Sequence, residues 1–307
     1  MPEPYIVVAG SPRSGTTLLR TLLKGSHALV IHPQEPHYIL EMHRRFGPTI
    51  TDVPSATEFI LGHSKFPASL VNPDRFREAL KTKSSVSLSE FLRISYRILR
   101  GDRPDAPLVL KHPAFMLHLD LVRELFPDLR VIHIVRDPRA NAFSQRTRWP
   151  STSYWMSATG WQSYIDAGVG IKRRGHIPYL ELRYEDLLKE PEAYCRRVCD
   201  FIDIPFEPGM LAFDHVQKDW NPTNPGEGAK RHYHGFEQDR IDKWRKYMKP
   251  VEVKLIENQC RRGMTLLGYQ TTDPHVSARE YVPFYLRERR RALQKSYRRL
   301  RRRWRER

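Results

Sequence analysis

Short apolar runs alternate with longer amphipathic stretches along most of this chain. Tyr5 to Ala9 is a continuous apolar run rich in β-branched residues, as buried parallel strands are, and Leu129 to Val135 is the clearest second core strand. Weaker runs at 27–31, 107–110 and 178–182 predict further strands. Apolar residues recur at helical spacing at about 16–23, 115–126, 140–146, 152–172, 191–202, 239–247 and 251–267. This alternation predicts an α/β fold, with a parallel sheet covered by helices on both faces.

Two regions depart from the alternation. Residues 36–105 contain several prolines between helical patterns, which predicts a mostly helical insertion. Residues 284–307 predict a basic amphipathic helix. We therefore expect a single domain over residues 1–283, followed by that helix. Residues 217–235 are polar and contain prolines and glycines, which predicts a loop.

The turn after the first strand has the composition of an anion site. Gly10 and Gly15 allow a sharp turn, and Thr16 and Thr17 begin the next helix. Such a loop directs several backbone N–H groups and a helix N-terminus at one point. The ATP-binding Walker A pattern requires a lysine where Thr16 stands, and the cation is instead Arg13. The loop is therefore suited to an anion but poorly suited to a nucleoside triphosphate.

The segment Pro12 to Thr17, PRSGTT, resembles the 5′-phosphosulfate loop of sulfotransferases that use 3′-phosphoadenosine 5′-phosphosulfate (PAPS). A second segment, VRDPRANAFSQRTR at 135–148, resembles the part of these enzymes that binds the 3′-phosphate. The resemblance implies a P-loop-type sheet, with PAPS as the co-substrate and no metal. In such a site, the phosphosulfate would be held by Arg13, Ser14, Gly15, Thr16 and Thr17, and the 3′-phosphate by Arg136, Ser144 and Arg148. Guanidinium groups bind phosphate in a bidentate manner, which suits these roles.

The protein-tyrosine sulfotransferase type is the closest in its motifs. The stretch around Glu35 resembles the segment that carries its catalytic glutamate, although Pro36 and His37 replace a Thr-Arg pair. Lys111 resembles a lysine that neutralises charge on the leaving oxygen. His112 is the alternative general base, because cytosolic sulfotransferases use a histidine close to that lysine. We rank Glu35 above it, with Arg13 and Lys111 as the other catalytic residues.

Two weaker matches complete the cofactor site. Tyr184, in RYEDL, resembles the family tyrosine that contacts the cofactor, and Lys243 belongs to a Lys-Trp pair resembling a C-terminal element of the domain. A loop at about 228–237, with Lys230 and Arg231, is expected to cover the cofactor. No histidine, cysteine or carboxylate group has the spacing of a metal site, so we expect none.

The cysteine content and the N-terminal sequence indicate the cellular compartment of the protein. The chain has 307 residues, a formal net charge of +17 and three cysteines. An odd, low cysteine count favours a reducing compartment, and MPEPYIVV enters the first strand without the pattern of a signal peptide. We also find no apolar window of about 18 residues, the length a membrane span needs. These observations predict a cytoplasmic location.

The C-terminal segment carries much of the charge. Residues 284–307 hold twelve Lys or Arg and two Glu. One helical side carries the apolar positions Leu286, Leu293, Tyr297, Leu300 and Trp304. An apolar stripe beside cations is typical of a helix lying on an anionic membrane. Packing on the domain or on a partner is the alternative. Nucleic acid is a lesser alternative, because no base-reading element accompanies the charge.

The expected reaction is transfer of a sulfonate group from PAPS to a hydroxyl acceptor. The acceptor can be a carbohydrate, a lipid, a small molecule or a peptide tyrosine, and the sequence does not choose among them. The rival enzyme is a P-loop kinase, which the missing Walker lysine and the Arg136–Ser144 pair oppose. The non-enzymatic rival is a basic module that binds a membrane or polyanion.

Overall fold

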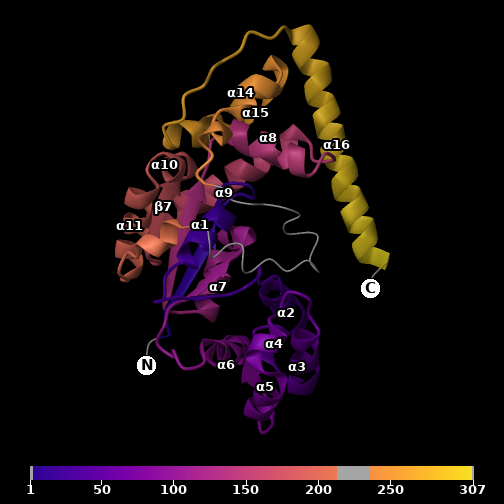
Figure 1. The fold of residues 1–307 in the computed structure, drawn as a ribbon. Helices are drawn as coiled ribbons and strands as arrows, with labels where there is room; N and C mark the ends of the chain where they lie inside the picture. The colour runs from indigo at the N-terminus through magenta and orange to yellow at the C-terminus, as the bar shows by residue number, and fades with distance from the viewer. Residues whose placement is uncertain (1–2, 213–234, 306–307) are drawn as a thin grey trace.

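Five parallel strands form the central sheet of the protein (Figure 1), in the order β2-β5-β1-β6-β7. The structure is a computed structural model, and it describes residues 3–212 and 235–305. The strands are β1 (Tyr5–Ala9), β2 (Val30–Ile31), β5 (Leu108–Lys111), β6 (Leu129–Val135) and β7 (Tyr179–Arg183). The predicted parallel α/β fold is confirmed. Because β5 and β6 flank β1, the three strands that precede the sequence motifs end side by side.

Alternate side chains of β1 enter two separate cores. Tyr5, Val7 and Ala9 face a core shared with α6 (Leu88–Arg100), α7 (Leu119–Leu125) and α9 (Tyr154–Arg174). Ile6 and Val8 face the opposite core, which contains α1 (Thr16–Leu23), α10 (Tyr184–Lys189) and α11 (Pro191–Ile202). The helices thus cover both faces of the sheet, as the apolar runs predict.

A third core lies beyond the end of β6. It joins α9 to α8 (Pro138–Arg148), α14 (Lys243–Tyr247) and α15 (Pro250–Leu266). Trp161 is almost fully buried there, and its indole N–H donates to the carbonyl oxygen of Arg136 at 2.9 Å. Gly263 permits this packing, because a Cβ at that position would lie 2.6 Å from the Trp161 ring. The core therefore holds the backbone of the second sequence motif.

The insertion forms a lobe at one end of the molecule (Figure 1). Its elements are α2 (Tyr38–Phe46), β3 (Thr49–Ile50), α3 (Val53–Leu61), α4 (Ala68–Val71), α5 (Pro73–Leu80), β4 (Val86–Ser87) and α6. The prediction of a mostly helical insertion is confirmed. The antiparallel pair β3–β4 was not expected, since each of these strands is only two residues long.

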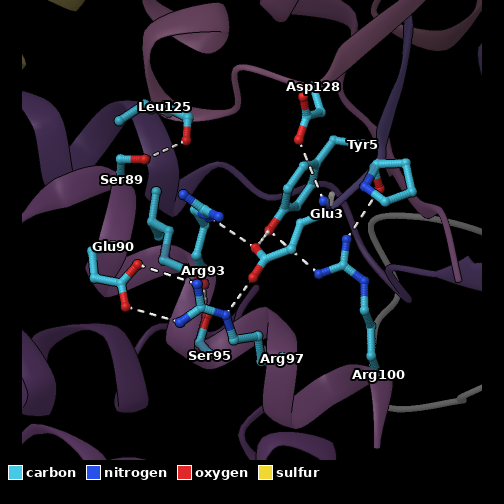
Figure 2. A network of polar contacts seen from close by, with 12 residues as sticks. Glu3, Tyr5, Ser89, Glu90, Arg93, Ser95, Arg97, Arg100, Leu125 and Asp128 are labelled. Atoms are coloured by element: carbon cyan, nitrogen blue, oxygen red, sulfur yellow. Dashed lines mark hydrogen bonds and ion pairs between the residues drawn. The ribbon is translucent and has the colours of Figure 1, made fainter. Parts of the chain in front are cut away.

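Charged contacts fasten α6 to the start of the sheet, as Figure 2 shows. Glu3 accepts hydrogen bonds from Arg93, at 2.8 Å, and from Arg97. The Arg100 guanidinium lies over the Tyr5 ring and donates to the carbonyl oxygen of Pro4 at 3.0 Å. These contacts fix the insertion on the same strand that leads into the anion-binding loop.

The remaining helices differ from the predictions mainly at their ends. The expected helix at 115–126 begins as the 3₁₀ helix η1 (Pro113–His118) and continues as α7, while 239–247 divides into η3 (Gln238–Arg240) and α14. The basic helix α16 (Ala278–Arg305) begins before Phe284 and packs on α9 and α15. Among the described helices, none is both long and apolar enough to cross a bilayer.

Candidate active site

The loop between β1 and α1 is shaped by positive φ angles. Gly10 has φ 147° and Gly15 has φ 104°, while Arg13 adopts φ 75°. A Cβ at Gly10 would lie 2.3 Å from the carbonyl oxygen of Ile134, so the loop passes directly against β6. Gly15 caps α1 without a side-chain hydrogen bond. The first-turn amides of α1 therefore remain available to an anion.

Side chains of α8 hold this loop. Asn141 is fully buried and donates from Nδ2 to the carbonyl oxygen of Pro12, at 2.9 Å, and to Ser14 Oγ, at 3.0 Å. Gln145 donates to Asn141 Oδ1 at 2.7 Å, which fixes the orientation of the Asn141 amide. Sequence reasoning missed both residues, although their spacing of four places them on one side of a helix.

The two sequence motifs meet directly. Arg13 Nε donates to Ser144 Oγ at 3.2 Å, and Arg136 Nη1 donates to the carbonyl oxygen of Arg13 at 3.0 Å. Arg136 Nη2 donates to the carbonyl oxygen of Arg240 at 2.7 Å, and its guanidinium lies 4.4 Å from the centre of the Tyr184 ring. The residues predicted to hold the two phosphate groups therefore share one network.

A cavity of about 330 Å³ opens over this network. Its lining includes nine residues singled out from the sequence: Arg13, Gly15, Thr16, Thr17, Arg136, Ser144, Arg148, Tyr184 and Lys243. Ser14 is the exception. Its amide donates to the Ser11 carbonyl oxygen at 3.1 Å and its hydroxyl accepts from Asn141, so the contact of Ser14 with the anion stays a prediction. The cofactor-covering loop at 228–237 lies largely outside the described residues.

Buried charges support the corner after β6. Glu185 accepts from the Asp137 amide at 2.9 Å and from the Tyr269 hydroxyl at 2.9 Å. Burial raises the pKa of the Glu185 carboxyl. Arg139 bridges Asp137, at 2.6 Å, and Glu257, at 2.7 Å, so both of these carboxylates have a cationic partner. This arrangement fixes the direction in which Arg136 leaves the strand.

Arg136 has one donor without a partner. Its side chain is buried, and its Nε–H makes no hydrogen bond within the part of the chain that the structure describes. A buried guanidinium donor of this kind is normally paired. Because Arg136 lines the cavity, this donor is suited to an anionic ligand there.

A second cavity, of about 480 Å³, adjoins the first. The two cavities share four lining residues, namely Arg13, Thr16, Thr17 and Arg148. Beyond this shared wall, the second cavity is lined by the three predicted acid–base residues Glu35, Lys111 and His112. Lys111 is at the end of β5, while Glu35 follows β2, the next strand in the sheet.

Glu35 is a partly buried carboxylate with two donors. It forms an ion pair with Lys111, and its Oε2 lies 3.3 Å from His37 Nε2. Burial alone would raise the pKa of Glu35, but the His37 hydrogen bond and the Lys111 ammonium together hold it well below the ordinary value. Glu35 is therefore ionised at neutral pH, with lone pairs left for a further donor.

His112 occupies a different environment. Burial and the neighbouring His37 lower the pKa of its ring to about 3, so His112 is neutral. Its Nδ1 accepts from the Ala114 amide at 3.2 Å, and its Nε2 lies 2.8 Å from His37 Nδ1. Both ring nitrogens of His112 are engaged, which favours Glu35 as the base that faces an acceptor.

The fold also assembles a group that the sequence spacing did not show. Potential ligand atoms of Glu35, His37 and His112 lie within 4.8 Å of one another. These three residues do not have the spacing of a metal site in the sequence. Residue 112 is distant in the sequence, and it reaches this group because β2 and β5 are paired.

The sequence profile described as "Sulfotransferase family" matches residues 4–208. The chain belongs to the sulfotransferase family. Protein-tyrosine sulfotransferase A of Caenorhabditis elegans is 27% identical over 290 residues, covering 91% of this chain and 70% of that protein. Human Carbohydrate sulfotransferase 6 is 24% identical over 239 residues, covering 67% of this chain and 57% of that protein. The chain thus spans less than two thirds of some of its sulfotransferase relatives.

Solved sulfotransferase structures share the fold. The sulfotransferase domain from the curacin biosynthetic pathway superposes with a TM-score of 0.63 at 19% identity, covering 88% of this chain and 99% of that domain. The corresponding domain of the Synechococcus PCC 7002 olefin synthase gives a TM-score of 0.57 at 23% identity, covering 84% of this chain and 94% of that domain. The architecture of this chain is that of the sulfotransferase fold.

Proposed function

We propose that this sulfotransferase moves a sulfonate group from PAPS to a hydroxyl acceptor. The observation that carries the proposal is the wall shared by the two cavities, formed by Arg13, Thr16, Thr17 and Arg148. One side of the wall presents groups suited to phosphates, and the other side presents the Glu35–Lys111 pair. Donor and acceptor would therefore meet at Arg13.

The residues of the first cavity fit PAPS. Arg13 and the amides of Gly15, Thr16 and Thr17 would hold the 5′-phosphosulfate. The 3′-phosphate would be held by Arg136, whose buried Nε–H lacks a partner among the described residues, together with Ser144 and Arg148. Tyr184 and Lys243 line the same cavity. We propose that this binding requires no metal.

The second cavity supplies the acid–base chemistry. Glu35 takes the proton of the acceptor hydroxyl while the acceptor oxygen attacks sulfur in line. The new O–S bond forms as the bond from sulfur to the bridging phosphate oxygen breaks. Lys111 and Arg13 neutralise the charge that develops on that oxygen. This role is supported by the burial of Lys111, by its ion pair with Glu35 and by its place in the lining of the same cavity as Arg13.

The acceptor class requires a direct test. The relatives above are named for protein tyrosine and for carbohydrate, and lipids and small phenols also carry suitable hydroxyls. The experiment incubates the purified chain with ³⁵S-labelled PAPS and a panel of tyrosine peptides, oligosaccharides, glycolipids and phenols. We expect label transfer to one class, abolished in Glu35→Gln. Transfer of phosphate from ATP with magnesium, and no transfer from PAPS, would instead support the kinase alternative.

We further propose that α16 brings the enzyme to an anionic membrane surface on the cytoplasmic side. Phe284, Glu288 and Ala292 are buried against the domain, and Glu288 accepts from the Tyr154 amide at 2.6 Å. Leu286 and Tyr297 lie on the solvent side and are 58% and 66% exposed. Packing on the domain thus engages one side of the helix and leaves apolar residues of another side for a membrane.

Vesicle co-sedimentation tests this contact. Leu286→Ser combined with Leu293→Ser and Tyr297→Ser removes the exposed apolar groups and keeps the buried side of α16. At physiological salt, we expect the full chain to bind vesicles containing phosphatidylserine and this variant to bind them much more weakly. Equal sedimentation of both proteins, or none by either, would contradict the proposal, and sedimentation only with added nucleic acid would favour a polyanion partner.

A further inference from the structure

His37 lies between Glu35 and His112 and belongs to neither of the two cofactor motifs. Its Nε2 is 3.3 Å from Glu35 Oε2, and its Nδ1 is 2.8 Å from His112 Nε2. The three side chains therefore form a continuous polar chain. All three line the second cavity.

A backbone amide fixes the direction of every hydrogen bond in this chain. The Ala114 N–H can only donate, so His112 Nδ1 is an acceptor and carries no proton. The single proton of neutral His112 is then on Nε2, and it is donated to His37 Nδ1. Because His37 Nδ1 accepts that hydrogen bond, the ring proton of His37 is on Nε2, which lies 3.3 Å from Glu35 Oε2.

The same assignment argues against a metal ion at this group. A histidine that binds a metal through Nε2 normally carries its proton on Nδ1 and donates it to an acceptor. His112 Nδ1 instead faces the Ala114 amide, which is a donor. In addition, the Lys111 ammonium already occupies the Glu35 carboxylate. Two of the three possible ligands are thus arranged for hydrogen bonding.

We propose that His37, held in its Nε2–H tautomer by His112, is a positioning residue that orients the Glu35 carboxylate toward the acceptor. This rests on the proposed function, in which Glu35 is the general base. With Lys111 on Oε1 and His37 on Oε2, the carboxylate is held from two directions, and Glu35 lines the second cavity. Without His37, the carboxylate keeps one donor and gains rotational freedom.

Nuclear magnetic resonance of the histidine rings tests the assignment without an acceptor. The full chain is labelled with ¹⁵N-histidine, and the signals of His37 and His112 are assigned with His37→Gln and His112→Gln. We expect both rings to be Nε2–H tautomers, unchanged by one equivalent of zinc chloride. An Nδ1–H tautomer at His112, a doubly protonated His37, or zinc-induced shifts of both rings would overturn the proposal.

Turnover as a function of pH tests the role itself, with the acceptor identified from the labelled-PAPS panel. For His37→Ala we expect kcat to fall about 10- to 100-fold, the factor that one charged hydrogen bond contributes, while affinity for 3′-phosphoadenosine 5′-phosphate stays within about twofold. Loss of the donor raises the pKa of Glu35, so the acid limb of the kcat profile should move to higher pH.

The control is His27→Ala, because the His27 ring is 96% exposed and pairs with Glu207 outside both cavities. It should leave the profile unchanged. An unchanged kcat in His37→Ala, or an equal fall at every pH, would overturn the positioning role. If the wild-type chain neither binds 3′-phosphoadenosine 5′-phosphate nor turns over, the proposed function fails, while the ring tautomers still decide the hydrogen-bond assignment.

Discussion

Arg13 donates from Nε to the hydroxyl of Ser144 over 3.2 Å, which links the loop after β1 to helix α8. The two residues belong to different sequence motifs, one expected at the 5′-phosphosulfate and the other at the 3′-phosphate. Their contact means that neither phosphate site is independent of the other. A change at Arg13 should therefore affect both cofactor affinity and turnover.

The Arg13 variants separate charge from geometry. Arg13→Ala removes the cation and the Ser144 contact, so we expect at least about a tenfold loss of affinity for 3′-phosphoadenosine 5′-phosphate and a further loss in kcat. Arg13→Lys keeps the charge but lacks the planar fork, and we expect it to fall between wild type and Arg13→Ala. Calorimetry and labelled-PAPS turnover measure the two effects. A wild-type rate in Arg13→Ala would mean that the loop does not contact the transferred group.

Asn141 should matter although it lines neither cavity. Asn141→Asp keeps the shape of the side chain but replaces the donor that faces Pro12 and Ser14. Each buried hydrogen bond lost costs about 1–3 kcal/mol, so loss of the two bonds should lower the free energy of unfolding by at least that amount, and the cofactor should bind more weakly. Denaturant unfolding and calorimetry provide the test. Ser163→Ala, which removes an exposed hydroxyl on α9, is the control and should change neither quantity.

Gly15 combines a positive φ with a close contact. A Cβ at this position would lie 2.3 Å from Tyr184 Cδ2, whereas one at Gly175, with φ 62°, would meet nothing within 4 Å. Gly175→Ala therefore measures the backbone cost alone, about 1 kcal/mol. We expect Gly15→Ala to cost about 1–3 kcal/mol more.

The origin of this extra cost can be checked in a double variant. Adding Tyr184→Ala to Gly15→Ala removes the steric clash but leaves the positive φ. The penalty of Gly15→Ala should then approach that of Gly175→Ala in thermal or denaturant unfolding. If both glycine substitutions destabilise equally from the start, the Tyr184 ring moves aside and the contact is unimportant.

Glu35 and His112 can be distinguished by substitution. Glu35→Gln preserves size but removes the base, so kcat should fall by roughly 10²–10⁴-fold while cofactor affinity stays nearly unchanged. His112→Ala should reduce kcat less, because both ring nitrogens of His112 are already engaged. Steady-state kinetics with the identified acceptor decide between them. An active Glu35→Gln beside an inactive His112→Ala would show that the histidine is the base.

Long apolar strands and local motifs could be predicted from the sequence. β1 begins and ends where its continuous apolar run does, and β6 is recognisable because five of its seven residues are apolar and mostly β-branched, with only Arg130 and His133 polar. The anion-binding loop could be predicted because Gly10 and Gly15 are required by backbone geometry. The strands β3 and β4 could not, because two residues carry too little periodicity.

Interactions between distant segments could not be predicted in this way. The polar chain through His37 and His112 depends on the pairing of β2 with β5, and no local pattern encodes that pairing. The burial of Asn141 beneath the loop similarly depends on how α8 packs. The apolar stripe of α16 was visible in the sequence, but the burial of Glu288 on the other side of the helix was not.

Calorimetric titration without magnesium tests the central claim most directly. 3′-Phosphoadenosine 5′-phosphate and ADP are titrated separately into the wild-type chain and into Arg136→Ala. The wild-type chain should bind 3′-phosphoadenosine 5′-phosphate at least about tenfold more tightly than ADP, because charge-assisted contacts from Arg136 and Ser144 require the 3′-phosphate. Arg136→Ala should lose most of that preference. Equal affinities for the two nucleotides in the wild-type chain, or binding that appears only when magnesium is added, would contradict a PAPS site.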